Sequence, residues 1–242
     1  QELSQVARQI RIDVLNMVYR AQSGHLGGSL SAAEILACLY FRQLRLDVSD
    51  PCWPARDRFL LSKGHAAPAL YSALALKGFV TRDDLRSLRC LDSRLQGHPD
   101  CKKTPGVEIS AGPLGHGLSI GAGMALAARL DGLDYRTYVL LGDGELQAGV
   151  VWEGAMTAAK YGLDNLVAIV DSNDVQLDGP VHAVMPVEPL VNKWEAFGWY
   201  VIDTDGHNVR ALLDALDRAA RIRGRPAALI ARTTKGKGIS FM

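Results

Sequence analysis

Two polar side chains that can bind a metal follow two apolar segments of the sequence. Asp143 lies in Gly142-Asp143-Gly144-Glu145, directly after the apolar run 138–141, and Asn173 follows the run 166–170, thirty residues after Asp143. A carboxylate and an amide oxygen are hard ligands of the kind that Mg²⁺ takes from proteins. Flanking glycines let a phosphate approach the backbone closely. The pair therefore predicts a site for Mg²⁺ held together with a diphosphate.

The segments around these two residues predict that they meet in space. The apolar runs read as buried strands, and the stretch between them, with Trp152, Met156 and Ala159 at helical spacing, reads as a helix that stops at Gly162. Strands joined by such a crossover are parallel and usually adjacent. Both side chains then lie beyond the carboxyl ends of strands, where open α/β sheets bind ligands. Alone, either would be an ordinary turn or loop residue.

The rest of the chain continues this alternation of helices and strands. Helices are expected over the first twenty residues and over 66–76, 115–130 and 209–220, strands over 59–62, 199–203 and 227–231, and a long ordered loop over 91–114. Ser31 and Glu34 fit a capping box that opens a further helix. The fold class predicted is α/β, a doubly wound, mostly parallel sheet with helices on both faces, and residues 1–242 are expected to form a single domain.

Composition excludes several classes of function. A net charge of +1 argues against nucleic acid or an anionic membrane as the main partner, and no apolar run is long enough to span a membrane. The four cysteines show no metal-binding spacing. We expect them to be reduced and mostly buried, which indicates a cytoplasmic protein.

The sequence resembles the thiamine-diphosphate enzymes, in which a Gly-Asp-Gly is followed at this distance by Asn, and within them the transketolases. The resemblance covers nearly the whole chain. Besides the two segments above, it rests on Ser23-Gly24-His25-Leu26-Gly27-Gly28-Ser29, Leu61-Ser62-Lys63-Gly64-His65-Ala66, Gln96-Gly97-His98-Pro99 and Ser110-Ala111-Gly112-Pro113-Leu114-Gly115-His116-Gly117. It implies the thiamine-diphosphate-binding fold, specifically the diphosphate domain.

The resemblance also implies roles for individual residues. Mg²⁺, or Ca²⁺ or Mn²⁺ in its place, would be bound by Asp143, Asn173 and the carbonyl of Val175; Asp171 and Asp174 compete as ligands but lie at other positions of the pattern. Thiamine diphosphate would be bound by residues on its diphosphate, aminopyrimidine and thiazolium sides, namely His65, Gly112, Pro113, Leu114, Gly142, Asp143, Gly144, Glu145, Asn173, Leu177 and Lys235.

Two histidines are the candidates for contact with substrate. His25 and His98 lie in Gly-His-Leu and Gly-His-Pro turns, where no helical or strand face explains them as core residues. With the cofactor motifs present, we expect them to contact ketose hydroxyls and to transfer protons at the carbonyl. His116 has a supporting role at most, because the family often has Gln there, and His182 and His207 are unassigned.

Departures from the family pattern bear on assembly. The family usually has Glu where this chain has Ala148, whereas the nearby acidic residue Glu153 is retained. The family's pyrimidine-binding domain, with its activating glutamate, and a later cofactor histidine do not occur within the 242 residues. The resemblance therefore implies the amino-terminal subunit of a split transketolase, which transfers a two-carbon ketol unit from a ketose phosphate to an aldose. The expected partner is a carboxyl-terminal transketolase subunit in an α2β2 assembly.

Two alternatives remain open from the sequence. One is a subunit of another thiamine-diphosphate enzyme that makes or breaks carbon–carbon bonds in specialised metabolism. The other is a non-catalytic subunit that only holds the cofactor. Retention of Asp143 together with Asn173 argues against the second, and Ala148 argues mildly for it.

Overall fold

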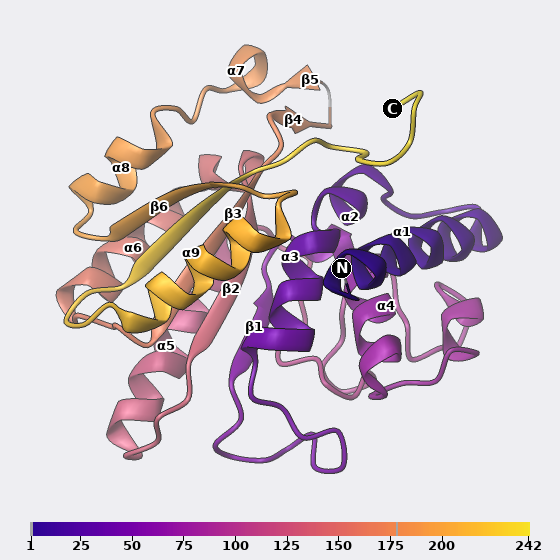
Figure 1. Cartoon of the computed structure of the whole chain (residues 1–242), viewed down its shortest axis with the longest axis horizontal. Helices are drawn as coiled ribbons and strands as arrows, with labels where there is room; N and C mark the ends of the chain where they lie inside the picture. Colours follow the sequence, from indigo (N-terminus) through magenta and orange to yellow (C-terminus); the bar gives the residue numbers. More distant parts are fainter. Residues whose placement is uncertain (1, 178) are drawn as a thin grey trace.

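Five parallel strands form the central sheet of the protein. The computed structural model describes residues 2–177 and 179–242. The strands are β1 (Arg58–Leu61), β2 (Thr137–Gly142), β3 (Leu166–Ser172), β6 (Tyr200–Asp205) and β7 (Ala227–Arg232), in the spatial order β1-β2-β3-β7-β6 (Figure 1). β2 and β3 pair in parallel from Thr137 opposite Leu166 to Gly142 opposite Asp171. The predicted strand–helix–strand unit is confirmed.

Helices cover both faces of this sheet, as the sequence predicted. One face carries α5 (His116–Leu130), α6 (Gly149–Lys160) and α8 (Leu190–Ala196). The other carries α1 (Glu2–Ala21), α3 (Ala33–Cys38), α4 (Ala67–Lys77) and α9 (Val209–Arg221). Successive strand residues alternate between the two cores: Leu60 and Val139 belong to the first, Leu61 and Leu140 to the second. The doubly wound α/β class is therefore correct.

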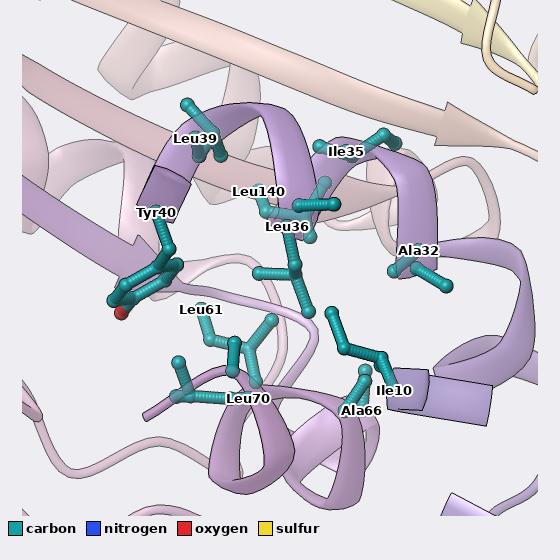
Figure 2. Close-up of a cluster of buried hydrophobic side chains, with 14 of the residues drawn as sticks. Ile10, Ala32, Ile35, Leu36, Leu39, Tyr40, Leu61, Ala66, Leu70 and Leu140 are labelled. Carbon is teal, nitrogen blue, oxygen red and sulfur yellow. The ribbon is translucent and has the colours of Figure 1, made fainter. Parts of the chain in front are cut away.

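The core beside β1 joins the amino-terminal helices to the sheet. Figure 2 shows side chains from α1, α3, α4, β1 and β2 converging there, among them Ile10, Leu36, Leu61, Leu70 and Leu140. All five are at most 2% exposed. Burial of each stabilises the fold by about 1.5–3 kcal/mol relative to exposure. This packing fixes the position of the segments that connect α1 to α3 and β1 to α4, which carry site residues.

Several short elements lie outside the sequence prediction. They are α2 (Gly27–Ser31), the 3₁₀ turns η2 (Gly64–Ala66) and η4 (Gly144–Gln147), the antiparallel pair β4 (Val175–Gln176) and β5 (Gly179–Pro180), and α7 (Val181–Val184). The π-helical turn η1 (Leu39–Gln43) continues the helix expected after Ser31, and the 3₁₀ turn η3 (Asp84–Ser87) forms where a short polar helix was expected from Thr81 onward. Figure 1 shows β4, β5 and the carboxyl-terminal segment along the upper side of the view, with α2 below the carboxyl-terminal segment. The long loop expected over 91–114 is confirmed, since no helix or strand forms there and every residue of it is described.

The predicted capping box at Ser31 and Glu34 is wrong. Ala32, which precedes α3, makes no side-chain cap bond. The Ser31 hydroxyl is buried and donates to Asp171 Oδ2 at 2.6 Å, and the Glu34 carboxylate accepts from Arg11 at 2.7 and 2.5 Å. Both side chains thus bind distant parts of the chain, and these tertiary bonds replace the local ones that the motif offers.

The cysteines are unpaired, as predicted, but their burial was predicted wrongly. Cys38 is buried, whereas Cys52, Cys90 and Cys101 are exposed. The three exposed thiols lie on loops, where no core-facing periodicity acts on them. Among the residues that the structure describes, no helix combines the length and the apolar character that crossing a membrane requires.

Candidate cofactor and substrate site

The carboxyl ends of the strands bring together residues from distant parts of the sequence. Lys63 and His65 follow β1, Asp143 follows β2, Asn173 follows β3 and Lys235 follows β7. The chain runs from β1 to β3 in one direction and then returns through the edge strand β6 to β7. Ligands of doubly wound sheets bind where the strand order reverses in this way. The site accordingly lies at the ends of β2, β3 and β7.

Asp143 is a buried carboxylate that is held by backbone amides. Its side chain accepts from Gly144 N at 2.8 Å and from Asp174 N at 2.5 Å, and the residue is 4% exposed. The second bond connects the end of β2 to the segment after β3, where Asn173 Oδ1 accepts from Val175 N at 3.2 Å. Burial raises the pKa of Asp143, although the two amide bonds oppose the shift. A cation beside this carboxylate would stabilise its charged form.

Lys235 connects the loop after β7 to the same group of oxygens. Its Nζ donates to the carbonyl oxygen of Val175 at 2.9 Å, so this carbonyl points toward a cation. Burial and the neighbouring Lys63 lower the pKa of Lys235. The structure therefore brings Asp143, Asn173, Val175 and Lys235 into one neighbourhood.

A buried ion pair lies beneath these residues and was not assigned from the sequence. The ammonium group of Lys63 donates to Asp171 Oδ2 and to the carbonyl of Gly28, the latter at 3.0 Å, and both charged side chains are at most 1% exposed. Asp171 also accepts from Ser31 and Thr233. Asp171 is thus satisfied within the protein and does not compete as a metal ligand. A charged residue within β3, directly after the apolar run 166–170, was the available signal.

Three histidine rings lie close together beside this ion pair. The centroids of His25 and His65 are 5.7 Å apart, and those of His25 and His98 are 6.3 Å apart. Burial, followed by the charge of Lys63, lowers the pKa of His65 to about 3. Burial, followed by the charge of Arg89, lowers the pKa of His25. His25 and His65 are therefore neutral imidazoles near pH 7, and His98 is exposed.

The buried Nδ1 of His25 has no hydrogen-bond partner among the described residues. A buried polar atom without a partner costs about 1–3 kcal/mol, so such an atom in a loop is a signal of ligand contact. Arg89 lies beside His25, and its guanidinium donates to Ser23 Oγ at 3.0 Å. The same guanidinium also covers Gly97, where an added Cβ would lie 2.9 Å from Arg89 Cζ. Arg89 thus joins the turn of His25 to the turn of His98.

Glu145 was predicted to contact the cofactor, and its side chain forms hydrogen bonds within the protein. It is 4% exposed and accepts from Gly115 N at 2.8 Å, from Gly142 N at 3.0 Å and from the Ser62 hydroxyl. Its carboxylate therefore connects the end of β1, the end of β2 and the start of α5. Three internal donors thus occupy the oxygens of this carboxylate, and a contact of Glu145 with the cofactor remains a prediction.

Four further predicted residues, Gly112, Leu114, Gly144 and Leu177, are partly or largely exposed. Gly112 adjoins His98, since a Cβ at Gly112 would lie 3.7 Å from His98 Cγ. Leu114 is 43% exposed and Leu177 is 91% exposed. Gly144 is covered by the side chain of Gln176, whose Oε1 would lie 2.9 Å from an added Cβ. A side chain at position 144 would therefore require Gln176 to shift, since an added Cβ would also lie 3.2 Å from Gln176 Cβ.

The chemistry of these donors fits a small divalent cation. The described residues contain no group of three or more His, Cys, Asp or Glu side chains arranged around a point, so a site of the zinc type is not formed by them. Asp143, Asn173 and the Val175 carbonyl instead offer one charged and two neutral oxygens. Mg²⁺ commonly takes few ligands from a protein when phosphate oxygens supply others.

Hard oxygens, two neutral imidazoles and a lysine lie together where the strand order of this doubly wound sheet reverses. This arrangement is typical of enzymes that bind a phosphorylated cofactor. The chain belongs to the transketolase family: the family model described as "Transketolase, thiamine diphosphate binding domain" matches residues 3–241. It is a thiamine-diphosphate-dependent transferase chain of the transketolase type.

Relatives and solved structures agree with this assignment. The chain is 45% identical over 240 residues to 6-deoxy-6-sulfo-D-fructose transketolase subunit SqwG of Clostridium sp. (strain MSTE9), covering 99% of this chain and 87% of that protein. It is 46% identical to a subunit of the apulose-4-phosphate transketolase of Actinobacillus succinogenes, covering 100% of this chain and 87% of that protein. The transketolase structure from Campylobacter jejuni is similar with a TM-score of 0.94 at 36% identity, over 98% of this chain.

The length of the match differs between the two groups of relatives. The chain spans 38% of the Campylobacter jejuni chain and 37% of the transketolase chain from Leishmania mexicana, which matches with a TM-score of 0.93 at 35% identity. It spans most of the proteins that are named as subunits. The similarity thus covers the diphosphate-binding part of the full-length enzymes.

Proposed function

We propose that this protein is the diphosphate- and metal-binding subunit of a split transketolase that transfers a two-carbon ketol unit from a ketose to an aldose. The observation that carries the proposal is the bond between the Asp143 carboxylate and Asp174 N, which gathers the oxygens of Asp143, Asn173 and Val175 at the ends of β2 and β3. Residues 1–242 act in this proposal as one diphosphate-binding domain. The unpaired cysteines support a cytoplasmic location.

The metal is assigned to Asp143, Asn173 and the Val175 carbonyl, with Mg²⁺ as the natural ion and Ca²⁺ or Mn²⁺ as substitutes. In the structure, Lys235 Nζ donates to the Val175 carbonyl at 2.9 Å. If the Val175 carbonyl bound a metal ion, the ammonium group of Lys235 would be free to pair with a phosphate. The lowered pKa of Lys235 reflects the cost of its partly buried charge, which an anion would reduce.

The other cofactor contacts follow the chemistry of each side chain. His65, as a neutral imidazole, would donate a hydrogen bond to the diphosphate, and the Gly144 amide would do so if the Asp143 oxygen that accepts from it bound the metal instead. The backbone of Gly112 and Pro113 faces the aminopyrimidine, while Leu114 and Leu177 offer apolar surface to the cofactor. The bound cofactor supplies the carbanion chemistry that no side chain provides, and the protein supplies orientation and electrostatics.

His25 and His98 are assigned to the substrate. The unpartnered Nδ1 of His25 can bind a ketose hydroxyl, and its lowered pKa keeps the ring able to accept a proton near pH 7. His98 lies 6.3 Å from it between ring centroids, so one small sugar can reach both rings. The relatives' names specify a sulfonated fructose and apulose-4-phosphate, so anionic ketoses are the donors to test.

The pyrimidine-side carboxylate is proposed to come from a second chain. Two of the similar proteins carry names that make each of them one subunit of a transketolase. We therefore assign to this protein a partner of the carboxyl-terminal transketolase type, in an α2β2 assembly with two-fold symmetry and cofactors between subunits. A cofactor that contacts both chains also tightens their association by linkage.

A reconstitution experiment tests this function. The purified chain, with saturating thiamine diphosphate and Mg²⁺, is assayed for ketol transfer from a panel of ketose phosphates and sulfonated ketoses, alone and with the partner expressed from the same source. We expect transfer only from the mixture. Full activity of the chain alone would refute the split arrangement. Cofactor binding by the mixture without turnover of any donor would favour a non-catalytic subunit, and cleavage without transfer a different thiamine-diphosphate enzyme.

A further inference from the structure

His207, in the turn between β6 and α9, uses both ring nitrogens although the sequence assigned it no role. Its Nδ1 lies 3.0 Å from Glu34 Oε2, and Thr234 N donates to its Nε2 at 2.8 Å. Because Nε2 accepts a hydrogen bond, the ring proton is on Nδ1, which donates to the carboxylate. The side chain is 12% exposed. A ring with both nitrogens bound in this way has one orientation and one tautomer.

The Glu34 carboxylate that orients this ring is itself fixed. Arg11, on α1, binds it through two bonds of 2.7 and 2.5 Å, and the side chains of Arg11 and Glu34 are 15% and 10% exposed. Burial raises the pKa of Glu34, but hydrogen bonds from His207 and Arg11 outweigh that effect and lower it. Glu34 therefore stays ionised and accepts near neutral pH. The chain Arg11–Glu34–His207 joins α1, α3 and the β6–α9 turn.

The backbone N–H that His207 accepts from belongs to Thr234, the residue directly before Lys235. On the other side of Lys235, Gly236 N donates to Gly27 O at 3.2 Å. The aliphatic part of Lys235 lies over Gly27, where an added Cβ would be 2.8 Å from Lys235 Cγ. The loop is thus fixed on both sides of Lys235, and its Nζ ends at the Val175 carbonyl.

We infer that His207 is a positioning residue, which through Thr234 holds the backbone of Lys235 so that its ammonium group faces the diphosphate and metal side of the site. The inference rests on the proposed function, in which Lys235 meets the cofactor. A role confined to folding would require no connection to Lys235. His207 binds Glu34, 173 positions before it, and Thr234, 27 positions after it. These bonds therefore fix the loop that carries Lys235 rather than the turn in which His207 lies.

Substitutions at His207 separate the two hydrogen bonds. In His207→Gln the side-chain oxygen can reach the place of Nε2 and accept from Thr234 N, whereas in His207→Asn the shorter amide can reach only the place of Nδ1. His207→Ala removes both bonds. Asn208→Ala is the matched control in the same turn, because the Asn208 side chain caps α9 by accepting from Arg210 N and Ala211 N at 3.1 Å and does not hold Thr234.

Two measurements on the full chain test the inference. Hydrogen exchange of the 233–236 amides, without cofactor, should speed up in His207→Ala and His207→Asn but not in His207→Gln or Asn208→Ala. Calorimetry with thiamine diphosphate and Mg²⁺ in the assembled enzyme should show about a tenfold loss of affinity in His207→Ala, the value of one hydrogen bond, with rescue by Gln. In the Lys235→Ala background, His207→Ala should cost no further affinity.

Failure of the inference about His207 and failure of the proposed function give different results. Unchanged exchange at Thr234 in His207→Ala overturns the inference, and so does an equal affinity loss with and without Lys235, since His207 would then act through general stability. If the unmodified assembly binds no thiamine diphosphate, the proposed function fails instead. The exchange pattern of the four variants still decides in that case whether His207 fixes the Lys235 loop.

Discussion

Burial and neighbouring charge both act on the titration of His65. The ring lies beside the ammonium group of Lys63 and the ring of His25, and its pKa falls to about 3. A cationic imidazole would gain from a diphosphate, but in the cofactor-free protein the neighbouring positive charge and burial keep it neutral. Between about pH 3 and pH 6.5, His65 is therefore neutral in the folded protein and protonated in the unfolded chain.

This difference predicts how stability depends on pH. The unfolded chain binds a proton at His65 near the ordinary value of 6.5, whereas the folded ring binds it only near 3, so stability falls as the pH drops from 6.5 toward 3 and the loss is complete below that. Comparison of His65→Gln with the unmodified chain isolates this part of the slope. The variant should gain relative stability steadily between pH 6.5 and 4 in urea denaturation. A difference between the two proteins that does not change with pH would contradict the assignment.

Asp143 is predicted to be essential for metal-dependent cofactor binding. Asp143→Ala removes the single charged oxygen of the proposed metal set, so the affinity for thiamine diphosphate with Mg²⁺ should fall by more than about a hundredfold, the upper end for an indirect metal contact. Calorimetric titration of the assembled protein measures it. Asp174→Asn is the matched control: Asp174 is exposed, and Asn tolerates its φ of 59°. Unchanged binding in Asp143→Ala, or an equal loss in the control, would refute the metal assignment.

His25 and His98 are predicted to act on substrate rather than on cofactor. His25→Ala and His98→Ala should each lower kcat by about 10²–10⁴-fold, the usual contribution of one acid–base group, while the affinity for thiamine diphosphate changes little. Steady-state kinetics and calorimetry on the same preparations separate the two effects. His182→Gln, an exposed histidine on α7, serves as the comparison. Loss of cofactor with a normal rate per bound cofactor would show that the division of roles is wrong.

At the scale of elements, residue patterns predicted what is local and failed where partners are distant. The unit from β2 to β3 follows from two apolar runs and a helical pattern, and the structure confirms it. Ser31 and Glu34 fitted a local cap, but Ser31 binds Asp171, 140 residues away, and Glu34 binds Arg11. The pairing of Lys63 with Asp171 spans 108 residues, so no window along the sequence contains both charges.

Glu145 shows how one side chain can hold three elements. Its carboxylate accepts from Gly115 N, Gly142 N and the Ser62 hydroxyl, at the start of α5 and the ends of β2 and β1. Glu145→Gln places a donating NH₂ where only acceptors fit, so the free energy of unfolding should fall by about 1–3 kcal/mol. Urea denaturation measures the change. Glu153→Gln, on the exposed side of α6, should shift stability by less than about 0.5 kcal/mol. Equal effects of the two substitutions would contradict this role for Glu145.

At the scale of the whole molecule, the sheet order determines when the site can form. β7 is the last strand along the described chain, yet it lies between β3 and β6, and its pairing with both is parallel. During synthesis, β6 and α9 leave the ribosome before the strand that attaches them to the sheet exists. The nascent chain then exposes the unpaired edge of β3 and a β6–α9 segment that has no strand to pair with. Both are prone to aggregate or to bind chaperones. Only when residues 227–235 emerge can β7 join the sheet and the loop that carries Lys235 take its place, so the sheet and the proposed cofactor site are completed in the same step.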